Sequence, residues 1–129
     1  MKHKERTLMT ELMLLSNTDI YEARDEYSSY DCYSSKAIIE LKIRDKYYPT
    51  KMIELDKMVR CTEIAKDMNK DFVYVVKDPQ GIHYLNITEN LSTILRKPAT
   101  KIACPKTTEF ANNSKVDKLV YNINMIQIC

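Results

Sequence analysis

The apolar run over residues 37–43 carries two charged residues on one face, and this pattern constrains the fold more than any other feature. The run reads Ala-Ile-Ile-Glu-Leu-Lys-Ile and predicts a buried strand, because it is apolar, rich in isoleucine and as long as a strand. Side chains alternate between the faces of a strand, so Glu40 and Lys42 share one face while Ile39 and Leu41 point to the other. Opposite charges on one face of a buried strand need a structural or chemical reason.

A second acid, Asp31, stands nine residues before Glu40 on another extended segment, residues 29–33. Two carboxylates offer oxygen ligands to a hard divalent cation such as Mg²⁺, and Lys42 adds an ammonium beside them. We expect Asp31 and Glu40 to be metal ligands and the main-chain carbonyl of Leu41 to be a third. Lys42 is expected to assist the attack of water. This set suits the hydrolysis of phosphodiester bonds.

Two alternatives to this interpretation stay open. An edge strand that carries Glu40 and Lys42 on its solvent face, as part of a cross-strand ion pair, would explain the pattern without any catalysis. If the strand register differs, Asp25 or Glu26 would replace Asp31 as a ligand. Against the first alternative, Glu40-Leu41-Lys42 is the only acid-x-lysine triplet in the chain, and it falls in the middle of the strongest strand.

Size and composition limit the classes to which the chain can belong. A length of 129 residues predicts a single domain over residues 1–129. A net charge of +2 excludes a polybasic protein but is compatible with a basic groove. One glycine excludes the Gly-rich phosphate loops of nucleotide-binding folds. Four cysteines without metal-ligand spacing, and no signal peptide or membrane-spanning segment, predict a cytoplasmic protein with reduced thiols and no membrane partner.

The periodicity of the apolar residues predicts the order of the secondary-structure elements. Helices are expected over residues 4–15, 52–69 and 88–96, and strands over residues 37–44, 72–76, 83–87 and within 116–128, with extended segments over 20–35. Asp78-Pro79-Gln80-Gly81 predicts a type I turn, and residues 97–116 are expected to form a basic loop. This order predicts an α/β (α+β) domain with a mixed central sheet flanked by helices.

The element order, with Asp31 and the triplet Glu40-Leu41-Lys42 in it, resembles the PD-(D/E)xK nuclease superfamily. The resemblance covers residues 5–87 and is strongest to small resolvase-like or phage-type endonucleases, although Tyr30 stands where the motif has proline. It implies a three-layer, restriction-endonuclease-like core and a nuclease that uses Mg²⁺ or Mn²⁺. It also implies DNA as the partner, including branched DNA.

The resemblance suggests two further site residues. Members of the resolvase-like branch often place a glutamate of the first helix near the metal, and Glu11 matches that position best. Glu5 is the alternative, although its place in the first helical turn is explained by the helix dipole. The helix after the motif strand often aims a polar or basic residue at the site, which suggests Lys57. An ion pair of Lys57 with Glu54 or Glu63 is the alternative.

Basic and aromatic residues suggest how nucleic acid would be held. We expect contacts to phosphates, without reading of the base sequence, from Lys36, Arg44, Lys46, Lys57 and Lys106. Five tyrosines in extended segments or turns offer rings that stack on bases or pack against neighbouring residues: Tyr27, Tyr30, Tyr33, Tyr47 and Tyr48.

The sequence therefore predicts a metal-dependent deoxyribonuclease, and more narrowly a structure-selective endonuclease similar to Holliday junction resolvases. A chain this small has little surface for reading a long base sequence, so we expect it to recognise a DNA structure or to act as a homodimer. Two other classes stay open. One is a nucleic-acid-binding module of the same fold without catalysis. The other is a protein-interaction or inhibitor domain that uses an exposed strand edge.

Overall fold

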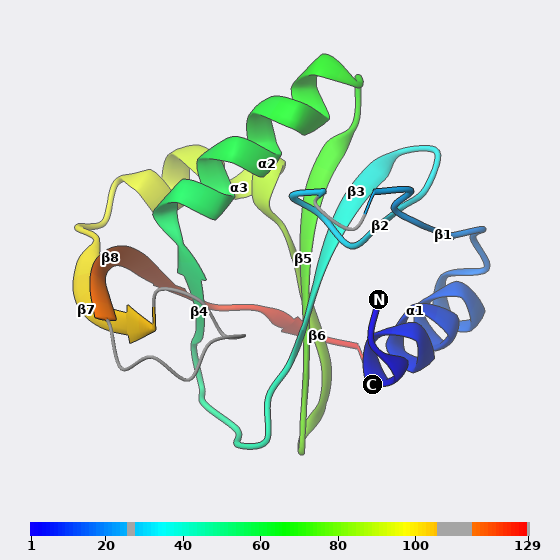
Figure 1. Cartoon of the computed structure of the whole chain (residues 1–129), viewed down its shortest axis with the longest axis horizontal. Coiled ribbons are helices and arrows are strands. Elements are labelled where there is room, and N and C mark those ends of the chain that lie inside the picture. The colour runs from blue at the N-terminus through cyan, green and yellow to red at the C-terminus, as the bar shows by residue number, and fades with distance from the viewer. Residues whose placement is uncertain (26–27, 106–114, 129) are drawn as a thin grey trace.

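The computed structural model describes residues 1–25, 28–105 and 115–128 (Figure 1). The elements follow one another as α1 (His3–Ser16), β1 (Tyr21–Glu22), β2 (Cys32–Tyr33), β3 (Ala37–Ile43), β4 (Lys51–Glu54), α2 (Leu55–Asp67), β5 (Asp71–Asp78), β6 (Gly81–Asn86), α3 (Ile87–Leu95), β7 (Thr100–Pro105), β8 (Lys115–Ile123) and β9 (Ile126–Gln127). Within these ranges, no helix is both long and apolar enough to span a membrane.

A mixed sheet with the strand order β1-β2-β3-β5-β6-β9 forms the centre of the molecule. β3 and β5 are parallel, with Glu40 opposite Tyr74, and the other neighbouring strands are antiparallel. The parallel pair is possible because the connection between β3 and β5 contains the helix α2. β3 lies inside the sheet, between β2 and β5, so the alternative that treats Glu40 and Lys42 as an ion-paired face of an edge strand is wrong.

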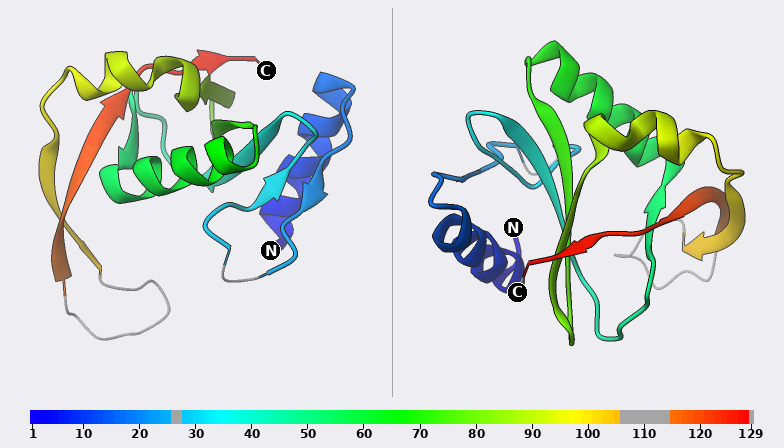
Figure 2. Two further views of the ribbon diagram at one scale, coloured as in Figure 1. Left: turned by 90° about the horizontal axis from the view of Figure 1, so that it is seen from above. Right: turned by 180° about the vertical axis from the view of Figure 1, so that it is seen from behind.

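Helices cover both faces of this sheet, as the sequence predicted. α1 lies on one side, while α2 and α3 lie on the other (Figures 1 and 2). Leu41 and Val75 pack with Leu8 of α1, whereas Ile38 packs with Met58 of α2, because successive residues of β3 point to opposite faces. Full burial of a side chain of this kind stabilises the fold by about 1.5–3 kcal/mol.

Single residues determine where α1 ends, where α3 begins and how the chain turns between β5 and β6. Asn17 ends α1 in the left-handed conformation, with φ of 51°. Asn86 caps α3, because its side chain accepts a hydrogen bond from the amide of Glu89 at 3.0 Å. The turn between β5 and β6 places the chain's only glycine, Gly81, at φ of 132°, a region that residues with a Cβ avoid.

A second sheet, with the order β4-β8-β7, was not predicted from the sequence. Residues 52–54 are predicted as the start of a helix, but they belong to β4, in which Lys51 pairs with Ile123. β7 falls in the expected basic loop, and the expected last strand divides into β8 and β9, which belong to different sheets. These strands pair with partners far along the chain, and four residues are too few to separate a strand period from a helix period.

Candidate functional site

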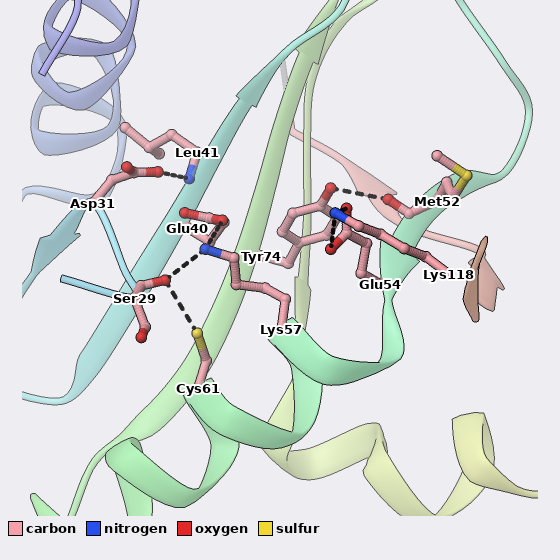
Figure 3. A network of polar contacts seen from close by, with 10 residues as sticks. All are labelled: Ser29, Asp31, Glu40, Leu41, Met52, Glu54, Lys57, Cys61, Tyr74 and Lys118. Atoms are coloured by element: carbon pink, nitrogen blue, oxygen red, sulfur yellow. Dashed lines mark hydrogen bonds and ion pairs between the residues drawn. The ribbon is translucent and has the colours of Figure 1, made fainter. Parts of the chain in front are cut away.

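The pairing of β2 with β3 brings Asp31 to the motif strand. The Asp31 amide donates a hydrogen bond to the carbonyl of Ile39 at 3.0 Å, which continues the β2–β3 ladder by one residue. Oδ2 of Asp31 then accepts a hydrogen bond from the amide of Leu41 at 2.7 Å (Figure 3). The amide and carbonyl of a strand residue point to the same edge, so the Leu41 carbonyl faces the side of β3 on which Asp31 lies.

Glu40 lies next to Asp31 and is only 4% exposed. Its Oε2 is 2.9 Å from Nζ of Lys57, which comes from the first turn of α2. The same ammonium donates to the carbonyl of Ser29 at 2.8 Å, and the thiol of Cys61 donates to that carbonyl at 3.3 Å (Figure 3). The segment before β2, the motif strand and α2 therefore meet at one buried carboxylate.

Lys57 forms its ion pair with Glu40 of β3 and not with a carboxylate of its own helix or the residue before it. The alternative in which Lys57 binds Glu54 or Glu63 is therefore wrong. Glu54 instead pairs with Lys118 of β8 at 3.3 Å, which links the second sheet to the start of α2. Sequence reasoning could not assign the partner of Lys57, because that partner is set by how α2 crosses the central sheet.

The surroundings of Glu40 raise the pKa of its carboxyl group. Burial raises the pKa of Glu40 most, and the hydrogen bond and negative charge of Asp31 raise it further. Lys57 acts in the opposite direction, and the pKa of Glu40 is raised to about 8. Two carboxyl groups in such close contact gain stability from an added cation, because its charge reduces their mutual repulsion.

Lys42 shares the face of Glu40, and both line a small cavity of about 70 Å³. Arg44, Lys57 and Tyr74 also line it. Among the described residues, no carboxylate forms an ion pair with Lys42, so its ammonium is available to a ligand in the cavity. A space of this size can hold water molecules or a hydrated ion, but not a nucleotide.

On its other side, Asp31 borders a wider groove of about 840 Å³. Acidic groups outnumber basic ones in this groove, which is lined by Glu5, Glu22, Asp25 and Asp31 against Lys2, Arg24 and the N-terminal ammonium of Met1, and that ammonium pairs with Glu22 at 3.2 Å. Asp25 thus lies near Asp31 but in the loop before β2, whereas the β2–β3 register brings Asp31 itself to β3.

The two acids of α1 lie in different surroundings. The carboxylate of Glu11 is 2.6 Å from Nζ of Lys77 on β5. Among the described residues, no contact joins Glu11 to either candidate ligand, so its role in a metal site stays a prediction. Glu5 lines the acidic groove together with Asp31. Glu26, the other acid considered as a ligand, lies outside the described residues.

The four described basic residues that were predicted to contact nucleic acid do not all line one groove. Arg44 and Lys46 line a groove of about 540 Å³ at the end of β3, and Lys57 lies at the candidate site. Lys36 precedes β3 and lines a different, apolar groove beside α1. Lys106 lies outside the described residues.

The donor set fits a magnesium-type ion. Within the described ranges, no three His, Cys, Asp or Glu side chains are grouped closely enough to hold a metal. The candidate ligands are two carboxylates, from Asp31 and Glu40, and one main-chain carbonyl, from Leu41. Mg²⁺ commonly binds one or two carboxylates, keeps several waters and takes further oxygens from a phosphate, so it does not require a third acid.

Comparison with known proteins supports the fold. No family model matches the chain, and no curated protein sequence matches it. Among solved structures, Hjc from Archaeoglobus fulgidus, a Holliday junction resolvase of an archaeal hyperthermophile, is similar with a TM-score of 0.55. The two are 11% identical, over 92% of this chain and 86% of that chain. The chain therefore has a resolvase-like fold, with a central mixed sheet flanked by helices.

Proposed function

We propose that this chain is a metal-dependent deoxyribonuclease that hydrolyses phosphodiester bonds, and that it is a structure-selective endonuclease acting on branched DNA. One observation supports the proposal: Asp31 accepts a hydrogen bond from the Leu41 amide beside buried Glu40, and Lys57 and Lys42 lie next to Glu40 in the ion pair and in the small cavity. The fold shared with a Holliday junction resolvase supports the same class of activity.

In this proposal, Asp31, Glu40 and the carbonyl of Leu41 hold Mg²⁺ or Mn²⁺. The bound metal supplies a water of lowered pKa and neutralises charge on the phosphate. Lys42 lines the cavity beside Glu40, where its ammonium positions the attacking water and stabilises the negative charge that develops on the phosphate. Lys57 holds the Glu40 carboxylate in place through the 2.9 Å ion pair.

The size of the chain supports a homodimer as the form that cuts a junction. Two copies related by a two-fold axis would present two identical sites to the two strands of a symmetric branch. A single copy has little surface for reading a base sequence. Both considerations favour recognition of DNA structure over DNA sequence.

The proposal is tested by cleavage of end-labelled DNA as single strands, duplexes, flaps and four-way junctions, in Mg²⁺, Mn²⁺ or EDTA. We expect metal-dependent cutting, a loss of about 10²–10⁴-fold in Lys42→Ala, and no change in Lys66→Ala, which removes an exposed lysine at the far end of α2. Calorimetry should show that Lys42→Ala still binds Mn²⁺. Absence of cutting on every DNA, with the fold intact by circular dichroism, overturns the proposal.

A nucleic-acid-binding module without catalysis is the second candidate, and one contact favours it. The ammonium of Lys57 already compensates the buried charge of Glu40, so the fold does not need a metal at this point. This candidate predicts DNA binding that is equal in EDTA and in Mg²⁺, and no heat of Mn²⁺ binding in wild type or in Asp31→Asn. Metal binding that Asp31→Asn abolishes rejects it.

A further inference from the structure

The small cavity beside Glu40 adjoins a larger groove under the loop that joins β3 to β4. The groove of about 540 Å³ shares Arg44, Met52 and Tyr74 with the cavity of about 70 Å³. The hydroxyl of Tyr74 donates to the carbonyl of Met52 at 3.0 Å, which fixes the boundary between the two spaces (Figure 3). The small cavity has room for an ion and water, whereas the groove has the volume of a typical ligand pocket.

Of the two grooves near the candidate site, the β3–β4 groove has the charge that favours binding of a nucleic acid. Among the described residues that line the β3–β4 groove, none is acidic, and Arg44 and Lys46 lie at its exposed rim. The groove on the other side, next to Asp31, is lined by four carboxylates against Lys2, Arg24 and the N-terminal ammonium of Met1, so acidic groups outnumber basic ones there. A phosphodiester backbone carries one negative charge per nucleotide, so it is stabilised at the basic rim and repelled by the acidic groove.

An aromatic ring in the groove offers a surface for a base. Tyr48 is 56% exposed and lines the groove, with the hydroxyl of Thr50 and the amide of Asn122 as polar neighbours. Exposed aromatic rings bind the faces of unpaired bases by stacking. A base inside a continuous duplex is already stacked on both sides, so it reaches such a ring only where the strand is single or the base is unpaired.

The buried lysine Lys51 holds the β3–β4 loop, which carries Tyr48, in place. Lys51 is only 6% exposed and lies 3.0 Å from the carboxylate of Asp78. Its ammonium also donates a hydrogen bond to the carbonyl of Tyr48 and lies 4.3 Å from the centre of the Tyr47 ring. Asp78 compensates the charge of Lys51, so this lysine orders the loop rather than attracting phosphate. An ordered loop lowers the entropy that binding would otherwise cost.

We propose that the β3–β4 groove is a subsite for one unpaired nucleotide adjacent to the scissile phosphate, with Tyr48 stacking on its base and Arg44 and Lys46 contacting its phosphates. This inference rests on the proposed nuclease function and deepens it, because it specifies the substrate. DNA with an unpaired nucleotide next to the cut, as in a flap, a gapped branch or a single strand, is preferred over continuous duplex.

The base contact is tested by fluorescence anisotropy with labelled oligothymidylate and with an abasic strand of equal length and charge. Ca²⁺ is present because it binds carboxylate oxygens, and a denaturing gel verifies that the probes are uncut. Tyr48→Ala should weaken oligothymidylate binding about 5- to 100-fold, in line with loss of one stacked base, and leave abasic binding unchanged. Tyr21→Ala is the control, because Tyr21 is 54% exposed on β1, away from the groove.

The phosphate contact is tested through the salt dependence of binding. Lys46→Gln should reduce the slope of log affinity against log salt concentration by about 0.7, the value for one phosphate contact on a single strand. Lys66→Gln removes another exposed lysine, on α2, and should leave the slope unchanged.

The outcomes separate this subsite from the nuclease proposal. If Tyr48→Ala binds both probes as wild type does, or if Tyr21→Ala weakens binding equally, the subsite is wrong even when metal-dependent cutting is observed. If wild type binds neither probe, the subsite is wrong as well. If binding depends on Tyr48 and on the base but no DNA is cut in Mg²⁺ or Mn²⁺, the groove binds an unpaired nucleotide, and the nuclease proposal fails together with the placement of this nucleotide next to a cut.

Discussion

Nζ of Lys57 lies 2.9 Å from a carboxylate oxygen of Glu40, so a cation from α2 already occupies a position on the acid that a metal ion would bind. The ion pair is largely buried, with side-chain exposures of 28% for Lys57 and 5% for Glu40. The metal and the lysine therefore either share the carboxylate, one on each oxygen, or compete for it. This relationship can be tested without any measurement of catalysis.

Lys57→Met should lower the free energy of unfolding in EDTA by about 1–3 kcal/mol, because it leaves the buried Glu40 without its partner; the partial exposure of Lys57 keeps this below the cost of a fully buried pair. Mn²⁺ should then raise Tm more in the variant than in wild type, since the ion replaces the missing positive charge. Differential scanning calorimetry across a Mn²⁺ titration measures both effects.

Lys66→Met is the matched control for this experiment, because it removes an exposed lysine of the same helix. It should change neither the stability in EDTA nor the response to Mn²⁺. An equal Mn²⁺-induced shift of Tm in Lys57→Met and wild type would show that the lysine and the metal do not interact through Glu40.

The acids of α1 give a second prediction. Glu11→Gln should change stability by at most about 1 kcal/mol, because Glu11 pairs with Lys77 at a partly exposed position. The sequence prediction that Glu11 serves the metal requires a loss of Mn²⁺ affinity, whereas the ion pair with Lys77 favours unchanged affinity. Glu5→Gln should weaken Mn²⁺ binding, because Glu5 lines the acidic groove beside Asp31 and contributes negative potential there. Isothermal titration calorimetry compares the two variants, and a loss of affinity in Glu11→Gln alone would place Glu11 at the metal.

Asp78 gives a prediction about pH. Burial alone would raise the pKa of Asp78, but its contacts with Lys51 and His83 outweigh that effect and hold the pKa below its ordinary value. A lowered folded-state pKa stabilises the protein above the unfolded-state value of about 4, and this contribution is lost as the pH falls through the folded-state pKa.

Asp78→Asn should therefore lower the free energy of unfolding by about 3 kcal/mol at pH 6, because it leaves Lys51 without its partner. The difference in this free energy between variant and wild type should shrink towards pH 3. Urea unfolding at pH 6, 5, 4 and 3 measures this difference. Asp56→Asn, at an exposed position of α2, should show no such trend. A difference that is constant over this range would mean that the Asp78 carboxylate is not the titrating group.

The thiols of Cys32 and Cys61 should be inert in the folded protein. Burial raises the pKa of Cys32 to about 12 and that of Cys61 to about 11, and only the thiolate reacts with alkylating reagents. Iodoacetamide at pH 7.5 should leave both residues unmodified in buffer and modify both in 8 M urea, as peptide mass spectrometry would show. Equal modification in the two conditions would contradict the buried positions.

The parts of the fold that the sequence predicted are those with a local signal. The strand over residues 37–43 has an apolar run of the right length, and the turn at Asp78–Gly81 has proline and glycine at the positions that a tight turn favours. The mixed character of the central sheet follows from the helix between the strands that become β3 and β5, because a connection of that length allows parallel pairing. Such features depend on residues close together along the chain, so they can be read without knowing the tertiary structure.

The parts that were missed depend on distant partners. β4 is four residues long and becomes a strand because β8 pairs with it, and the register of Lys51 with Ile123 joins residues about seventy positions apart along the chain. The last segment looks like one strand in the sequence, but it bends between two sheets. The β-propensity of its residues cannot predict a strand whose formation depends on pairing with a distant strand.

The candidate site shows the same division between local pattern and packing. Strand alternation alone placed Glu40 and Lys42 on one face, because side chains alternate in any strand. The partners of Lys57 and Glu11, and the charges of the two grooves beside Glu40, depended on how α1, α2 and the β3–β4 loop pack around the sheet. The alternation comes from backbone geometry within a few residues, whereas the ion pairs and grooves come from contacts between elements that only the folded chain brings together.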